Sequence, residues 1–328
     1  MIKIKRGIHT FSLSVQCSYS DIQNVRTANA CILKKSDAYC LNHTYQITAY
    51  KDIGIEILLH QSLTRRSWLK LIVNPSSLLA GEYCPTGLFR CARAEIRQVK
   101  KKLRKILKQI GFEREMKDFK LSRLDLTRDI YCKSADEVAT RLQSFKKSYV
   151  MPRYQPVPFK KYAGNETKVR GANHHSWTVA SGQCAFSVYD KSWELATRHD
   201  VVIGEHILRQ ELRLERKRIR QLTDTQNWWD QLVDIYEEQD KQLDKFLHRL
   251  YQDFDRIVPL EELLREIDAS NFREKTRKQM RQLAKKMDGC ESLTAARKRL
   301  RMKKKSFIGL LERFRKLGIS PITLSFVI

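Results

Sequence analysis

Three stretches of this chain alternate between apolar and polar residues, and this alternation restricts the fold more than any other feature. In the stretch 119–131, Leu124 and Leu126 fall on one face of an extended strand and the residues between them fall on the other. The stretches 184–190 and 206–216 alternate in the same way. Such strands suit an antiparallel sheet with one face on a core and one polar face. We therefore expect an α+β protein centred on an antiparallel sheet.

Further strands and helices are predicted around these three stretches. Strands are expected within residues 1–60, including a hairpin of 45–50 with 53–59, and at 68–73 and 176–181. Apolar residues at intervals of three and four predict helices over 89–110, 134–147, 224–252 and 306–317, another after Pro259, and a short helical turn at 76–79.

After Thr223 the alternating, strand-like pattern gives way to helical spacing of apolar residues, which predicts two domains. We expect a sheet-centred domain over 1–222 and a basic, mainly helical domain over 223–328. Residues 271–305 hold 14 Lys or Arg against 3 Asp or Glu. The end of the chain, 321–328, is predicted as a strand. The last domain is then either a small helix-turn-helix or winged-helix module, or a basic helical bundle that binds DNA without sequence preference.

The charge of the chain points to a polyanionic partner. It contains 63 Lys or Arg and 37 Asp or Glu, for a net charge of +26. Nucleic acid is the first candidate, because no long apolar span or signal peptide favours a membrane. The basic run 100–105 on a predicted helix is either a solvated face or a phosphate contact. Eight cysteines without a Cys-x-x-Cys pair favour free thiols in a reducing cytoplasm rather than a zinc site.

The polar faces of the three alternating strands carry a set of residues suited to phosphoryl transfer, if these strands are neighbours. A phenol has a pKa of about 10, so Tyr189 would need a nearby cation or metal to attack a phosphate. Carboxylates bind Mg²⁺ or Mn²⁺, and cations neutralise charge on the phosphate. The set comprises Tyr189 as nucleophile, Asp125 and Glu211 as metal ligands, and Lys191, Arg209 and Arg213 as cations. The alternative is an ordinary sheet tyrosine on a polar outer face.

Four short motifs occur in the order found in a known family. They are Asn74–Leu79 with Gly81, Ser122–Leu126, Tyr189-x-Lys191-x-x-Glu194-Leu195, and Leu208–Arg213. In this order and spacing, the chain from about Tyr45 to Arg220 resembles the rolling-circle replication initiators of filamentous phages, the gene II/X type, and the related Rep_trans plasmid initiators. The C-terminal stretch 303–318 is similar to the final helices of that family.

The resemblance implies a function. Tyr189 would cut one strand at a double-stranded origin, stay joined to the 5′ phosphate, free a 3′ hydroxyl for priming, and later rejoin the strand. It places metal-related roles on Asp125 and Glu211 and supporting charge on Lys191, Arg123, Arg209 and Arg213. Glu194 would help or begin the next helix, while Asp129 and Glu215 are outside the shared pattern. It implies origin duplex and single-stranded DNA as partners, with a helicase and a DNA polymerase of a bacterial host, in the cytoplasm. The oligomeric state stays open, with a dimer as one candidate.

Other functions stay open at this point. A conjugative relaxase would share the chemistry, and a non-enzymatic origin-binding protein or repressor would explain the charge alone. A tyrosine recombinase is suggested by the His-x-x-Arg form of 206–209, with Tyr236 as nucleophile, but this stretch alternates like a strand. An initiator with a histidine-hydrophobic-histidine metal motif is disfavoured, because His174 and His175 are adjacent and would point to opposite faces of a strand.

Overall fold

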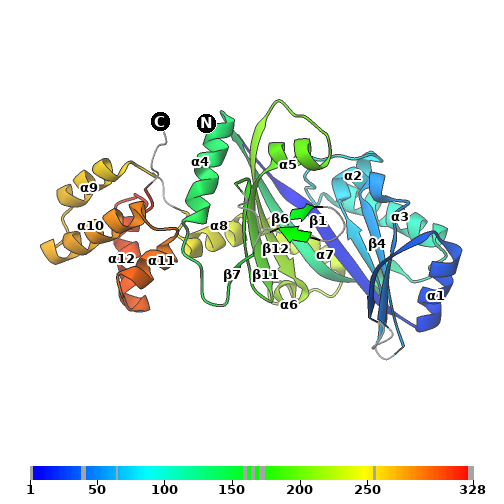
Figure 1. The fold of residues 1–328 in the computed structure, drawn as a ribbon. Coiled ribbons are helices and arrows are strands. Elements are labelled where there is room, and N and C mark those ends of the chain that lie inside the picture. The colour runs from blue at the N-terminus through cyan, green and yellow to red at the C-terminus, as the bar shows by residue number, and fades with distance from the viewer. Residues whose placement is uncertain are drawn as a thin grey trace.

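A ten-stranded antiparallel sheet organises the chain (Figure 1). The computed structural model describes residues 3–37, 42–63, 66–157, 161–163, 167–169, 174–253 and 256–323. The strand order is β2-β3-β4-β5-β1-β6-β12-β11-β10-β7, and β8 and β9 form a separate ribbon. The strands are β1 (Ile4–Cys17), β2 (Cys31–Asp37), β3 (Asn42–Ile47), β4 (Ile55–Ser62), β5 (Ser67–Val73), β6 (Lys120–Cys132), β7 (Gln155–Pro156), β8 (Lys161–Ala163), β9 (Thr167–Val169), β10 (Ser176–Ala180), β11 (Cys184–Asp190) and β12 (His206–Glu215). The predicted α+β fold around an antiparallel sheet is confirmed.

The first strand joins the two halves of the sheet. β1 pairs with β5 on one side and with β6 on the other, so it occupies the centre although it begins the chain. Its pairing with β6 shifts register between Ile8 and Thr10 and again between Ser12 and Leu13. Bulges of this kind bend a strand and redirect side chains. The first of them contains His9, which becomes important at the candidate site.

One face of the sheet is covered by helices. The covering helices are α1 (Tyr19–Ala28), α3 (Arg93–Gln109), α4 (Ala135–Lys146), α7 (Trp228–Glu237) and α8 (Gln239–Leu250). Apolar strand residues lie side by side beneath them, as where Leu126 of β6 lies opposite Leu212 of β12. Phe11 of β1 stacks on Trp228 of α7, with 5.7 Å between ring centroids. The opposite face is therefore left for the polar side chains of the same strands.

Local signals explain where several helices begin and end. Ser134 caps α4 by accepting a hydrogen bond from the Glu137 amide, as its sequence predicts. The segment 224–252, predicted as one helical segment, forms α7 and α8 with a break at Glu238. Helix α1 differs from the prediction, which placed only strands within residues 1–60. Ser18 and Asp21 form a capping box that begins it. Short elements complete this part, namely α2 (Pro75–Ala80), α5 (Lys191–Arg198), α6 (Arg216–Ile219), η1 (Lys51–Ile53) and η2 (Met116–Asp118).

A second hydrophobic core lies in the C-terminal helices, away from the sheet in Figure 1. It is built by α9 (Leu260–Ala269), α10 (Glu274–Asp288), α11 (Leu293–Arg299) and α12 (Lys304–Lys316). Backbone contacts attach it to the end of α4, since the Leu293 amide donates to Lys147 O at 2.9 Å. Because α7 and α8 pack on the sheet, the two cores divide the chain later than the predicted 222/223 boundary. Most of the predicted final strand, 324–328, lies outside the described residues, and 321–323 forms no strand.

Two predictions about surroundings concern membranes and thiols. No helix of the described residues has the length and apolar character needed to cross a membrane. The described cysteines are free thiols, and Cys40 lies outside the described residues.

Candidate active site

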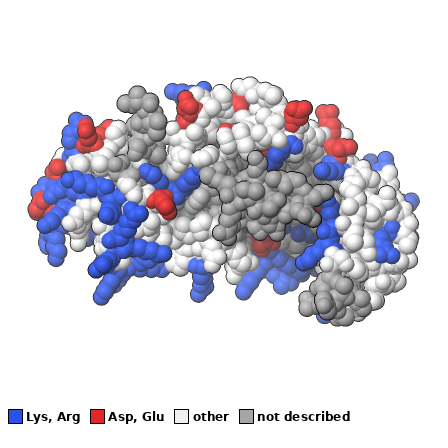
Figure 2. Space-filling model, in the orientation of Figure 1, with Lys and Arg blue, Asp and Glu red and all other residues white. Residues whose placement is uncertain are grey.

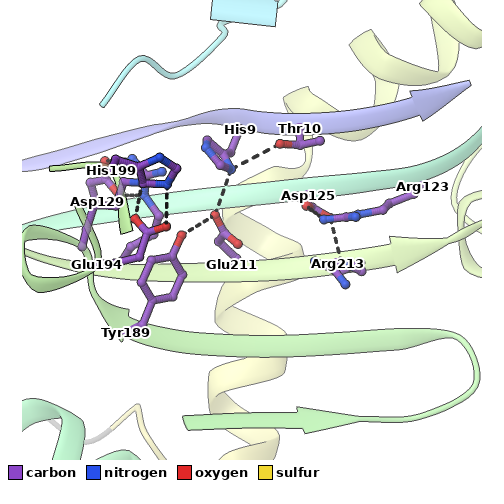
Figure 3. A network of polar contacts seen from close by, with 12 residues as sticks. His9, Thr10, Arg123, Asp125, Asp129, Tyr189, Glu194, His199, Glu211 and Arg213 are labelled. Atoms are coloured by element: carbon purple, nitrogen blue, oxygen red, sulfur yellow. Dashed lines mark hydrogen bonds and ion pairs between the residues drawn. The ribbon is translucent and has the colours of Figure 1, made fainter. Parts of the chain in front are cut away.

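Three neighbouring strands bring most of the predicted site residues onto one face of the sheet (Figure 3). In the order β6-β12-β11, Tyr189 lies opposite Arg209, and Arg213 lies opposite Asp125. Glu211 falls between the two arginines on the same face, because alternate strand residues share a face. The condition set by the sequence, that these strands are neighbours, is therefore met.

Tyr189 is the central phenol of this face. Its hydroxyl donates a hydrogen bond to Glu211 Oε1 at 2.9 Å. Burial raises the pKa of Tyr189 well above its usual value, the negative charge of Glu211 adds to the rise, and Arg209 opposes it. The phenol is therefore neutral in the free protein at neutral pH. Any attack by its oxygen requires that the proton leave during the reaction.

Glu211 connects Tyr189 to a histidine on the central strand. Nδ1 of His9, in the first bulge of β1, lies 3.1 Å from Glu211 Oε1. Burial by itself would raise the pKa of Glu211, but His9, Arg209 and the hydrogen bond from Tyr189 outweigh it and lower that pKa. Glu211 is thus a carboxylate that accepts from several donors. No sequence motif marks His9, because it lies outside the matching motifs and reaches the site through a bulge.

Arg209 is held by Asp129 in a fully buried ion pair. Both side chains are 0% exposed, and Arg209 Nε and Nη2 donate to the two Asp129 oxygens at 2.7 and 2.8 Å. This bidentate geometry fixes the guanidinium plane. The remaining nitrogen, Nη1, is buried and has no hydrogen-bond partner among the described residues. Asp129, outside the shared motif pattern, is thus the residue that positions Arg209.

The Asp125 carboxylate accepts hydrogen bonds from two arginines. Arg123 donates to both of its oxygens, from Nε at 2.9 Å and from Nη2, and Arg213 Nε donates at 3.2 Å. The Asp125 side chain is 1% exposed. Lys70 of β5 lies nearby. Burial lowers the pKa of Lys70, and the positive charge of Arg123 lowers it further. These residues form a second group of cations around one carboxylate.

Lys191 lies at the start of α5, directly after the Tyr189 strand. Its amino group pairs with Glu194 at 2.7 Å, and Glu194 also faces His199 at 3.5 Å. Burial, and then the charge of Arg209, lowers the pKa of Lys191. Lys191 therefore lies within electrostatic range of Arg209 while paired to its own helix. Glu194 both belongs to the first turn of α5 and holds this lysine.

The described residues do not form a ready metal site. Among them, no three His, Cys, Asp or Glu side chains gather closely enough to hold an ion. Mg²⁺ and Mn²⁺ need several oxygen or nitrogen donors. Glu211 and His9 offer two donors side by side, whereas the Asp125 oxygens are taken by arginines. A shared ion between Asp125 and Glu211 does not fit this arrangement, and metal dependence stays a prediction.

The His-x-x-Arg pattern of 206–209 and the adjacent pair His174 and His175 do not form catalytic sites among the described residues. His206 begins β12, a strand, so its His-x-x-Arg form is not on a helix. Tyr236 of α7 packs against the core on the helix-covered face, away from Arg209. His175 stacks on Trp193 at 4.1 Å between centroids, and His174 is exposed. Neither pattern joins the polar face around Tyr189.

Comparisons with known proteins give a distant structural similarity. No protein-family profile and no curated protein matches the sequence. Among solved structures, the chain is similar to a rolling circle replication initiator protein from Geobacillus stearothermophilus, with 10% sequence identity and a TM-score of 0.37. The match covers 76% of this chain and 86% of that one. A TM-score this low does not establish a common fold, so the similarity assigns no family to this chain.

Proposed function

We propose that the chain is a DNA nicking and joining enzyme that initiates rolling-circle replication, with Tyr189 as its nucleophile. The observation that carries the proposal is the hydrogen bond from the Tyr189 hydroxyl to Glu211, beside the buried Arg209. A phenol, a proton acceptor and a fixed cation on one polar face are the parts that phosphoryl transfer to a tyrosine needs. The net charge of +26 supports DNA as the substrate.

The proposed reaction is a transesterification. Tyr189 Oη forms a bond to the scissile phosphorus as its proton passes to Glu211, and the bond from phosphorus to the 3′ oxygen breaks. The departing oxygen takes up a proton from solvent and becomes the 3′ hydroxyl. Because the pKa of Glu211 is lowered, proton transfer accompanies bond formation rather than preceding it. The phosphodiester energy is kept in the phosphotyrosine, so rejoining needs no ATP.

The cations of this face have separate proposed roles. The buried Arg209, fixed by Asp129, would stabilise negative charge on the phosphate through its own positive charge. Lys191 adds charge from α5, while Arg123 and Arg213 would contact phosphates further along the strand. Glu211 and His9, the two donors that lie side by side, would hold Mg²⁺ or Mn²⁺, which would neutralise phosphate charge. This predicts that EDTA abolishes nicking and that Mn²⁺ restores it.

The C-terminal helices are proposed to bind origin DNA. Figure 2 shows Lys and Arg gathered over them. A bacterial cytoplasm and a host helicase and polymerase belong to the same proposal. A conjugative relaxase would use the same site for another purpose. A non-enzymatic origin-binding protein would leave the contact between Tyr189 and Glu211 without a role.

The test compares wild type with Tyr189→Phe and Tyr131→Phe. Tyr131 of β6 is a matched control, because it is a tyrosine of the same sheet, two strands away from Tyr189, with its ring 4.1 Å from Lys3 Nζ. Each protein is incubated with supercoiled DNA of its own replicon and Mn²⁺, then quenched in detergent. We expect wild type and Tyr131→Phe to give nicked circles with attached protein, and Tyr189→Phe to bind DNA without nicking.

Two outcomes would change the assignment. Equal nicking by Tyr189→Phe would make Tyr189 an ordinary sheet residue and return a recombinase or a water-based nuclease. Binding by all three proteins without nicking, on DNA that carries the origin, would favour a non-enzymatic origin-binding protein.

A further inference from the structure

A second concave site lies on the helix-covered side of the sheet, at its edge. It is a cavity of about 520 Å³ between the β10–β11 turn, α6 and α8. Cys184, at the start of β11, is part of its wall. Tyr189 is five residues further along the same strand and points to the opposite face, so the two sites are roughly 17 Å apart along β11. The cavity is therefore separate from the candidate active site.

The rim of the cavity is strongly basic. Five cationic side chains line it, and no Asp or Glu is among its lining residues. Arg218 donates to the neutral amides of Gln221 and Gln242. No ion pair joins any of the five to a carboxylate of the described residues. The five are Arg153, Lys217, Arg218, Lys245 and Arg249. Unpaired cations around a hollow attract an anion that carries more than one charge.

The inner wall of the cavity is apolar. Leu212, Leu214 and Phe246 are buried core residues that reach it from β12 and α8. Tyr154 packs edge-on against Phe246, with 5.5 Å between ring centroids. A ligand that fills this space would place an apolar or aromatic part on the wall and its charges at the rim. A volume of this size is typical of small-molecule sites.

We propose that this cavity binds a small molecule that carries two or more phosphates on an aromatic or apolar body, in chemical class a nucleoside di- or triphosphate. Arg218 and Arg249 come from different elements, α6 and α8, and both line the same cavity. These two arginines can therefore contact one oligophosphate from two sides. The site does not depend on the proposed nicking reaction.

The experiment measures ligand binding to the full-length protein without DNA. Titration calorimetry uses ATP, inorganic triphosphate and a short oligothymidylate as probes. The test variant is Lys245→Gln with Arg249→Gln, two exposed residues of α8 whose loss leaves the core intact. The control is Lys285→Gln with Lys286→Gln, an exposed pair on α10 that removes the same charge. Arg218→Gln is a second test at the other side of the cavity.

We expect one ATP to bind per chain, more tightly than inorganic triphosphate. The α8 double variant should lose at least tenfold in affinity, Arg218→Gln should also weaken binding, and the α10 variant should match wild type. No binding of ATP would overturn the proposal. Equal losses in the α8 and α10 variants would do so as well, since binding would then reflect overall charge. Binding of the oligothymidylate alone would make the cavity part of a DNA path. Because DNA nicking is assayed separately, either proposal can fail without the other.

Discussion

At the scale of single residues, the polar face is a set of pairs that hold one another in place. Asp129 fixes Arg209, Arg123 and Arg213 share Asp125, Glu194 holds Lys191, and Tyr189 donates to Glu211. Only the last pair has a donor suited to attack a phosphate. The buried ion pairs position charge, and the phenol carries the proposed chemistry.

The pair of Asp129 and Arg209 sets the first prediction. Asp129→Asn leaves the guanidinium buried without its counter-charge, so the free energy of unfolding should fall by about 3–5 kcal/mol. Urea denaturation followed by circular dichroism measures it. Glu238→Gln, in an exposed pair with Lys241, is the control and should leave stability unchanged. A loss no larger than that of the control would mean that Arg209 finds another partner.

The pKa of Tyr189 sets a pH dependence. That pKa is raised in the folded protein, so the resulting stability is fully present below the unfolded value of about 10 and is lost as pH rises from there toward the folded value. Above about pH 10, wild type should therefore lose stability relative to Tyr189→Phe. Urea unfolding across this range measures the difference. The exposed Tyr19→Phe is the control and should track wild type. Parallel curves for wild type and Tyr189→Phe would contradict the raised pKa.

At the scale of elements, the sequence predicted the parts of the site whose pattern is local. The alternation within β6, β11 and β12 is readable from neighbouring residues, so these strands and their polar faces were predicted. The pairing partners were not, because Arg213 meets Asp125 only in one register of two strands. His9 was missed for a similar reason, since it depends on a bulge in β1 and on a partner two hundred residues away.

Helix α7 is another element whose packing partner could not be predicted from the local sequence. Its apolar spacing predicts a helix but not the surface that it covers, and Trp228 is fully buried against Phe11 of β1. The indole also donates to Met116 O at 3.0 Å. Trp228→Ala should therefore cost about 3–5 kcal/mol of stability in urea denaturation. Its neighbour Trp229→Ala, half-buried, should cost less than half as much. Equal losses would contradict the placement of α7 on the sheet.

At the scale of the whole molecule, the sheet and the C-terminal helices differ in their cores and in their surface charge. The sheet has one face on its core and one polar face with Tyr189, and the C-terminal helices carry a separate core with a basic surface (Figures 1 and 2). Each phosphate contact releases counterions, so DNA affinity should fall steeply as salt rises. Lys and Arg residues occur both around the sheet and on the C-terminal helices. We therefore expect only those that face the DNA to contribute to binding.

Two sets of three cations test this division. Replacing Lys303, Lys304 and Lys305, exposed around the start of α12, by Gln should make the slope of log affinity against log salt shallower by about 2–3. Replacing Lys101, Arg104 and Lys105 of α3 should leave the slope unchanged, because α3 covers the face opposite Tyr189. Fluorescence anisotropy on origin DNA measures both. Equal slopes for the two variants would mean that the C-terminal helices have no special part in binding.

Locating the covalent bond between protein and DNA tests directly whether Tyr189 is the nucleophile. Wild-type protein would be incubated with origin DNA and Mn²⁺, digested with nuclease and trypsin, and analysed by mass spectrometry. We expect a nucleotide joined through its 5′ phosphate to the peptide that contains Tyr189. A nucleotide on a peptide with Tyr131 or Tyr236, or a nicked strand with a free 5′ phosphate and no modified peptide, would contradict it.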